Sequence, residues 1–400
     1  MNNRIASLQP YPFQKLANLF ANVTPPADKT KILLSLGEPK HLPPQFVLNK
    51  LADSLDALAH YPVAHGLSEL RTAICSWLAK RFAISNELLD PAQHVLPVAG
   101  TREALFSFAQ AIIDTNQPEK PLALMPNPFY QIYEGAALLA GAEPYFLNTD
   151  KTNHYQVNLD AVPDQVWQRA QLIYICTPGN PTGAVLNRES LKKLINLADK
   201  FDFIIASDEC YSEIYFDDKS PPPGLLEVAA AMGVTDFSRC IVFHSLSKRS
   251  NLPGLRSGFA AGDATILKKY LQYRTYHGAA LPVPTQLASI QAWSDEAHVI
   301  KNREMYRQKF AAVLDILGSV LTVQQPEAGF YLWAETPIND EDFAQQLYAN
   351  ENIVVLPGSY LSRDTEAGNP GENYIRMALV ASVEESIDAA KRIKNFTETI

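Results

Sequence analysis

Cysteine is scarce in this sequence and is not arranged for metal binding or cross-linking. The 400 residues include only four cysteines. They lie in or beside apolar segments without C-x-x-C spacing, which argues against a zinc or other metal site and against a disulfide framework. We therefore expect no metal, and a reducing, cytoplasmic compartment fits the sequence best.

Long apolar runs and clusters of basic residues are also missing. No apolar run approaches membrane-spanning length, and the N-terminus lacks the pattern of a secretion signal. Asp and Glu number 43 against 34 Lys and Arg, for a formal net charge of −9. Without a basic patch, we expect neither nucleic acid nor a membrane as partner. An enzyme acting on small molecules is favoured, and neither internal repeats nor low-complexity segments argue otherwise.

The chain is long enough for two domains. From about residue 94 to residue 245, short apolar strands alternate with amphipathic helices, which predicts an α/β domain with a largely parallel sheet. After residues 281–284 the pattern changes to a long amphipathic helix, at about residues 285–317, followed by short strands and helices. This change indicates a second, smaller α+β domain.

A lysine follows one predicted strand directly. The apolar run 241–243 is short enough to be a buried strand, so Lys248 lies where open α/β sheets place their catalytic groups. Ser245 and Ser247 supply hydroxyl donors, and Arg256 could hold a phosphate in a bidentate manner. Together they resemble a Schiff-base site beside an anion site. Taken alone, a lysine in a loop is usually a surface charge.

Two other segments place polar or aromatic groups at strand ends. Gly100, Thr101 and Arg102 open a helix after a strand, where free backbone N–H groups bind anions, although a plain helix cap is the alternative. Two prolines before Tyr130 keep the chain extended and present the ring, although core packing is the alternative.

A strand, a helix and a second strand carry two further candidates. Asn180 follows the first of these strands, and Asp208 ends the second. A right-handed βαβ unit brings both to the same sheet edge, where Lys248 should join them. Arg376 lies inside an apolar strand and should therefore have an anionic partner.

These groups are the parts of a pyridoxal 5′-phosphate pocket. Lys248 would hold the aldehyde, and Asp208 would pair with the ring nitrogen. Asn180 and Tyr211 would bind the ring 3′-oxygen, and Tyr130 would stack on the ring. The expected phosphate ligands are Thr101, Ser245, Ser247 and Arg256, with Gly100 and Arg102 beside them.

The order of these motifs resembles the class I/II aminotransferases of pyridoxal-phosphate fold type I. The resemblance covers nearly the whole chain. It implies a large domain of residues 48–284 with a mostly parallel seven-stranded sheet flanked by helices, and a smaller domain of residues 1–47 and 285–400. It also implies a homodimer in which Tyr61 reaches the partner's cofactor phosphate. Arg376, with the backbone at Gly37 and with Asn180, would bind the substrate α-carboxylate.

Three stretches resemble the proteobacterial N-succinyldiaminopimelate aminotransferases: residues 247–258, 126–135 and 273–278. Arg249 after the lysine and Gln131 after Tyr130 depart from the commoner family pattern and support this subgroup. Its substrates carry a second carboxylate, for which Arg274 is our first candidate and Arg249 and Arg102 are the next. The alternative for Arg274 is an ion pair with an acidic residue at the surface.

The resemblance implies a transamination from L-glutamate to N-succinyl-2-amino-6-oxopimelate in lysine and diaminopimelate biosynthesis. Lys248 would move the proton, with Asp208 and Tyr211 as the other catalytic residues. Alternatives are another transaminase specificity (aspartate, aromatic or alanine type) and a carbon–sulfur lyase. A pyridoxal-phosphate-sensing transcription regulator is disfavoured, because no basic DNA-binding module precedes Gly37 and the chain is acidic.

Overall fold

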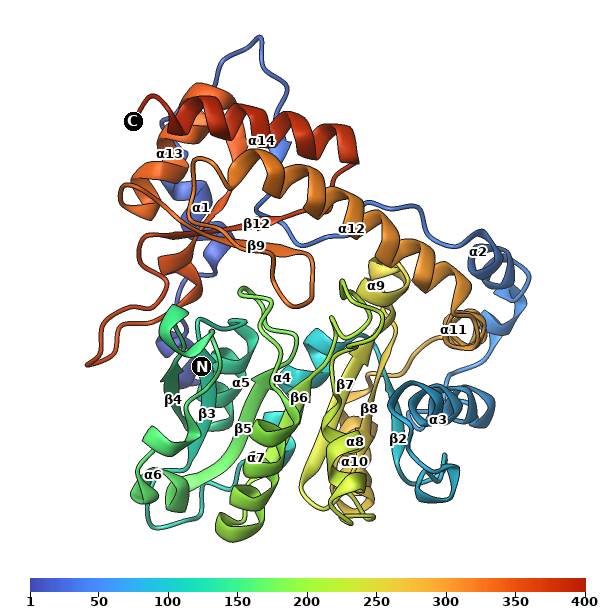
Figure 1. Ribbon diagram of the computed structural model, residues 1–400. Coiled ribbons are helices and arrows are strands. Elements are labelled where there is room, and N and C mark those ends of the chain that lie inside the picture. The colour runs from blue at the N-terminus through green and yellow to red at the C-terminus, as the bar shows by residue number, and fades with distance from the viewer.

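A seven-stranded sheet lies at the centre of the larger part of the computed structural model, which describes residues 1–400 (Figure 1). In spatial order, its strands are β2 (Val95–Val98), β8 (Gly258–Gly262), β7 (Cys240–Ser245), β6 (Ile204–Asp208), β5 (Ala170–Cys176), β3 (Leu122–Asn127) and β4 (Glu143–Asn148). Strand β8 runs antiparallel to both of its neighbours, and all the other pairs are parallel. The predicted α/β class and mostly parallel seven-stranded sheet are therefore confirmed.

Helices cover both faces of this sheet because its strands are apolar on both faces. In β7, Val242 belongs to the core on one face, and Ile241 and Phe243 belong to the core on the other. The first face is covered by α3 (Ser68–Phe82), α6 (Asp164–Arg169), α7 (Arg188–Phe201), α8 (Leu225–Ala231) and α11 (Val283–Ser294). The second is covered by α4 (Thr101–Ile112), α5 (Ile132–Ala140) and α10 (Ala264–His277).

The smaller part lies above the sheet in Figure 1 and has its own apolar core. Its strands are β9 (Tyr331–Glu335), β11 (Leu356–Pro357) and β12 (Tyr374–Ala378) in one antiparallel sheet, and β1 (Ile32–Leu33) and β10 (Ile353–Val354) in a parallel pair. Its helices are α12 (Ala297–Leu317), α13 (Asp340–Glu351) and α14 (Val383–Thr397). Because β1 pairs with β10, a segment near the N-terminus joins the C-terminal part of the chain.

Short helices complete the fold. They are α1 (Pro12–Leu19), α2 (Gln45–Ala52), α9 (Leu246–Arg249) and the 3₁₀ turns Asn3–Ser7, Leu55–Ala59, Asn86–Leu88, Lys151–Asn153, Leu159–Ala161, Pro253–Leu255 and Gly358–Leu361. None of the helices combines the length and the apolar character needed to cross a membrane.

The prediction of one long helix over residues 285–317 is wrong. The chain leaves the helical conformation at Asp295, which separates α11 from α12, and the Asp295 carboxylate accepts a hydrogen bond from the His298 N–H (3.0 Å). The two helices pack into different cores: Trp293 of α11 belongs to the larger part, and Phe310 of α12 to the smaller. We therefore propose that the smaller domain resumes at α12 and not at residue 285.

Candidate active site

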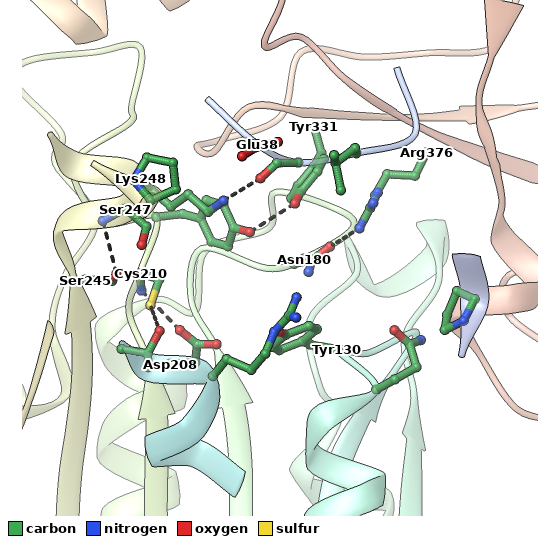
Figure 2. Close-up of a pocket in the computed structure, with 18 of the residues that line it drawn as sticks. Glu38, Tyr130, Asn180, Asp208, Cys210, Ser245, Ser247, Lys248, Tyr331 and Arg376 are labelled. Carbon is green, nitrogen blue, oxygen red and sulfur yellow. Dashed lines mark hydrogen bonds between the residues drawn. The ribbon is translucent and has the colours of Figure 1, made fainter. Parts of the chain in front are cut away.

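A cavity of about 540 Å³ opens at the carboxyl edge of the large sheet, below the smaller part (Figure 2). Most of the residues predicted from the sequence line it. They are Gly37, Thr101, Arg102, Tyr130, Asn180, Asp208, Tyr211, Ser245, Ser247, Lys248, Arg256 and Arg376. The strand ends supply the floor, and Gly37 and Arg376 come from the smaller part.

Lys248 lies just beyond the end of β7. Ser245 ends this strand, and its hydroxyl accepts a hydrogen bond from the Ser247 N–H (3.1 Å), which starts the one-turn helix α9. The lysine Nζ donates to the carbonyl oxygen of Gly37 (Figure 2). Burial, assisted by the nearby charge of Arg376, lowers the pKa of Lys248 to about 8. An amine with this pKa can both accept and return a proton near neutral pH.

Asp208 ends β6 and is buried, with 4% of its surface exposed. The hydroxyl of Tyr133 donates to its Oδ2 (2.7 Å), and the N–H of Cys210 donates to its Oδ1 (3.2 Å). No lysine or arginine forms an ion pair with it, and burial raises the pKa of Asp208. A buried carboxylate without a cation is unfavourable, so this group is suited to a cationic ligand.

Anion donors gather where β2 gives way to α4. Gly100 has φ +89°, and Thr101 then begins the helix, whose first N–H groups lack partners within the helix. Arg256 binds a backbone carbonyl (2.9 Å) but no acidic side chain. A Cβ at residue 100 would overlap its guanidinium, so glycine lets Arg256 approach the helix start. The buried hydroxyls of Ser245 and Ser247 lie at the same end.

Arg376, in β12, is the buried cation on the opposite side of the cavity. Its guanidinium donates to Oδ1 of Asn180 (2.9 Å) and to the carbonyl of Ser35 (2.6 Å), and lies 4.4 Å from the ring centre of Tyr331. The protein supplies no acidic side chain to this arginine, so the anionic partner that we expected for it would have to come from a ligand. The guanidinium is therefore available to a carboxylate from a ligand.

Two buried tyrosines face each other between the two parts. The hydroxyls of Tyr211 and Tyr331 are 3.0 Å apart. A Cβ at residue 37 would overlap the Tyr331 hydroxyl, so Gly37 leaves room for this pair. The tyrosine pair connects the sheet edge with the strand that neighbours Arg376.

Tyr130 and Arg102 form a further pair at the rim. The Arg102 Nε donates to the Tyr130 hydroxyl (2.6 Å), and burial raises the pKa of Tyr130. Arg102 is exposed and has no acidic partner. It therefore remains available to an anion in the cavity.

Several lining residues were not singled out from the sequence. Glu38, Cys210 and Tyr331 are among them, as are three residues of the N-terminal segment, Tyr11–Phe13. Tyr133, which binds Asp208, was also missed. No helical pattern marked Tyr133, because Tyr130 precedes α5 and the two hydroxyls have different partners.

The expectation that Arg274 binds a distal carboxylate is not met. Its side chain is fully buried outside the cavity, where it forms an ion pair with Glu103 (2.9 Å) and donates to the carbonyl of Ala279 (2.6 Å). Arg249 is likewise buried and forms an ion pair with Glu296. Arg102 is the remaining candidate of the three.

Tyr61 does not line the cavity of its own chain. Its ring is completely exposed. The role at a partner's cofactor therefore stays a prediction.

The residues present fit pyridoxal 5′-phosphate. Asp208 lacks the cation that the protonated ring nitrogen would supply, and the Gly100–Arg256 cradle with the start of α4 suits the phosphate. Lys248 would hold the aldehyde through its amine, Tyr211 and Asn180 would bind the 3′-oxygen, and Tyr130 would cover the ring.

Comparisons with known proteins identify a family and several structures with the same fold. Residues 29–393 match the model of the family "Aminotransferase class I and II". An LL-diaminopimelate aminotransferase from Syntrophobacter fumaroxidans is 33% identical over 98% of each chain. An aminotransferase structure from Neisseria meningitidis is 46% identical, with a TM-score of 0.93 over 99% of this chain and 100% of that one. A probable N-succinyldiaminopimelate aminotransferase from Thermus thermophilus is 25% identical, with a TM-score of 0.83 over 96% and 99% of the two chains.

The family model spans most of the chain, and most of the residues predicted from the sequence line one cavity. The chain belongs to the class I and II aminotransferases, which use pyridoxal 5′-phosphate and act on small amino and oxo acids.

Proposed function

We propose that this aminotransferase moves the amino group of L-glutamate to N-succinyl-2-amino-6-oxopimelate, a step in lysine and diaminopimelate biosynthesis. The observation that supports acidic substrates is the charge of the cavity. Three arginines line it, Arg102, Arg256 and Arg376, and none of them forms an ion pair with an acidic side chain. Arg256 serves the cofactor phosphate and Arg376 the substrate α-carboxylate. Arg102 therefore leads us to expect a third anionic group in the cavity.

The residues of the chain divide the work of transamination. Bound pyridoxal phosphate supplies the aldehyde that takes up the amino group and the ring that withdraws electrons from the substrate Cα. Arg376 and the amide of Asn180 hold the substrate α-carboxylate, which fixes the direction of the Cα–H bond. Lys248 would take the proton from the substrate Cα and return it, and Asp208 would hold the ring nitrogen of the bound cofactor in its protonated form.

Arg102 supports the N-succinylated substrate. Away from its reacting end, this molecule carries carboxylates and no free ammonium group. Arg102 is the unassigned cation of the cavity, and its guanidinium is held by Tyr130 (2.6 Å) at the rim. The γ-carboxylate of L-glutamate can use the same arginine in the other half of the reaction.

LL-Diaminopimelate itself is the second candidate. It is favoured by the relative that is 33% identical over nearly the whole chain. Its distal end bears an ammonium group beside a carboxylate, and an ammonium group requires an acidic or carbonyl partner. Glu38 lines the cavity and is exposed, so it is the side chain that would meet this charge.

A half-reaction separates these substrates. N-Succinyl-LL-diaminopimelate, LL-diaminopimelate and L-glutamate are added separately to the purified, cofactor-loaded protein, and loss of the visible absorbance is followed. We expect L-glutamate and the succinylated compound to remove the band, and their oxo acids to restore it. Rapid bleaching by LL-diaminopimelate but not by its succinylated form would transfer the assignment to the second candidate. A protein that never becomes yellow would contradict the role of Lys248.

A further inference from the structure

Tyr133 lies directly behind the carboxylate that faces the cofactor ring. We propose that Tyr133 is a positioning residue, whose hydroxyl fixes the orientation and the charge of Asp208 for the ring nitrogen of pyridoxal phosphate. This inference rests on the cofactor common to the family and not on the substrate proposed above.

The ring of Tyr133 has no freedom to turn away. Tyr133 is the second residue of α5, and its side chain is completely buried. One face stacks on Tyr174, with ring centres 4.7 Å apart and planes 9° apart, and its other neighbour is the edge-on ring of Tyr130, at 5.7 Å and 86°. The hydroxyl therefore reaches Oδ2 of Asp208 (2.7 Å) from a fixed scaffold.

The hydroxyl acts as a permanent donor. Burial and the neighbouring Asp208 raise the pKa of Tyr133, so the hydroxyl keeps its proton near neutral pH. Asp208 also accepts a hydrogen bond from the backbone N–H of Cys210, at the longer distance of 3.2 Å, and the Cys210 thiol lies beside it. The bond from the Tyr133 hydroxyl is shorter than the bond from the Cys210 N–H, and such charge-assisted bonds are the strong ones.

The other titratable groups near Asp208 come from several elements. They are Cys176 on β5, Cys210 and Tyr211 after β6, His244 on β7 and Tyr130 before α5. None of them is an arginine or lysine that could replace the hydroxyl. Without Tyr133, the carboxylate could rotate and take up the proton itself, which would leave the ring nitrogen neutral and weaken its pairing with the protein.

The two tyrosines of this segment then have different tasks. Tyr130 lines the cavity, where it would cover the face of the ring, whereas Tyr133 contacts the protein group that holds the ring nitrogen. Although the two tyrosines are only three residues apart, their hydroxyls have different partners: Arg102 for Tyr130 and Asp208 for Tyr133.

Tyr133→Phe tests the proposal because it keeps the buried ring and removes the hydroxyl. Apo-protein is titrated with pyridoxal phosphate, and the visible band of the loaded protein is titrated with pH. We expect about tenfold weaker cofactor binding. We also expect the pH midpoint of the visible band to rise, as in Asp208→Asn but by less, because a neutral ring withdraws fewer electrons from the imine nitrogen.

The matched control is Tyr174→Phe. Its hydroxyl is equally buried and donates to the carbonyl of Leu105 at the same distance of 2.7 Å, away from Asp208. Its loss should lower thermal stability without moving the pH midpoint. Equal cofactor affinities and midpoints in Tyr133→Phe and Tyr174→Phe would overturn the proposal.

A double substitution isolates the link between the two residues. In the Asp208→Asn background, Tyr133→Phe should change cofactor affinity by much less than it does in the wild type. An undiminished effect there would show that the tyrosine acts through packing.

If Tyr133→Phe does not fold, 3-fluorotyrosine at this position keeps the ring and should shift the pH midpoint of the visible band in the wild-type background only. No substrate is used, so these outcomes are independent of the substrate assignment.

Discussion

At the scale of single residues, we propose that turnover depends most directly on Lys248. Its Nζ lies in the cavity and donates to the Gly37 carbonyl. Replacement by alanine should leave the fold intact and reduce product formation by more than about a thousandfold, because both the covalent anchor and the proton carrier are lost. Release of 2-oxoglutarate from L-glutamate measures this. Appreciable steady-state turnover in Lys248→Ala would contradict the assignment.

Lys248 also predicts how the stability of the apo-protein depends on pH. Folding lowers the pKa of Lys248 from 10.5 to about 8, so the folded state disfavours the charged amine. Below pH 8, burial of the charged amine lowers the free energy of unfolding of the wild type by its full amount. This loss disappears as the pH rises to 10.5. Apo Lys248→Met should therefore unfold at a higher temperature than the apo wild type at pH 7.

The difference between these two melting temperatures should shrink between pH 8 and pH 10.5. Lys309, whose pKa is also lowered to about 8, is present in both proteins, so its contribution cancels. A difference that is constant with pH would show that the penalty does not come from the charge of Lys248.

Arg102 predicts a selective effect on substrate binding. Arg102→Gln removes the unassigned cation but retains a hydrogen-bond donor for Tyr130. We expect the KM for L-glutamate to rise about tenfold or more, with a smaller change for L-alanine, which has no second carboxylate. Steady-state kinetics with the two donors checks this. Equal changes for both donors would remove Arg102 from the distal site.

Site residues at the ends of strands were easier to predict from the sequence than the side chains that contact and support them. Asp208, Asn180 and Lys248 follow apolar runs, and the topology of a parallel sheet brings such positions to one edge. The misplacement of Arg274 has a simple cause. Its partner Glu103 is 171 residues away in the chain, so no local pattern shows the ion pair.

At the scale of elements, we propose that the junction of β2 and α4 forms the phosphate site. Gly100 has φ +89°, and a Cβ there would overlap the guanidinium of Arg256. Gly100→Ala should lower the free energy of unfolding by about 1–2 kcal/mol and weaken cofactor binding. Chemical denaturation and cofactor titration measure the two effects.

Gly135 offers the matched control within α5. A Cβ there meets only ordinary van der Waals contacts, the nearest at 3.7 Å. Gly135→Ala should be neutral or raise the free energy of unfolding by up to about 1 kcal/mol, because alanine favours a helix. Similar losses in both variants would contradict the special role of residue 100.

The break between α11 and α12 shows that the spacing of apolar residues does not by itself reveal where one helix ends and the next begins. Apolar residues continue at helical spacing through residues 285–317, so a single helix was the natural prediction. Two separate cores receive the two halves, and only the tertiary structure contains that information.

At the scale of the whole molecule, we propose a homodimer with active sites at the subunit interface. Tyr61 is 101% exposed, and Leu58 and Val63 beside it are each 61% exposed. An exposed apolar segment of this kind is typical of an interface. Sedimentation should give twice the mass of the chain, and a monomer that is fully active would contradict the proposal.

Tyr61→Phe should weaken cofactor binding without dissociating the dimer, because only the hydroxyl is expected to reach the partner's phosphate. Tyr276→Phe is a suitable control, because the ring of Tyr276 is exposed as well, at 90%. Cofactor titrations of the two variants that coincide with the wild type would remove Tyr61 from the site.

The N-terminal segment has a practical consequence for handling this protein. Residues Tyr11–Phe13 form part of the cavity wall, and Arg4 donates to the carbonyl of Leu139 in α5 (3.3 Å). The other end of the chain, after α14, lies at the periphery of the smaller part (Figure 1). A purification tag or fluorescent label is therefore better fused after Ile400 than before Met1, because the segment that follows Met1 packs on α5 and then forms part of the cavity wall.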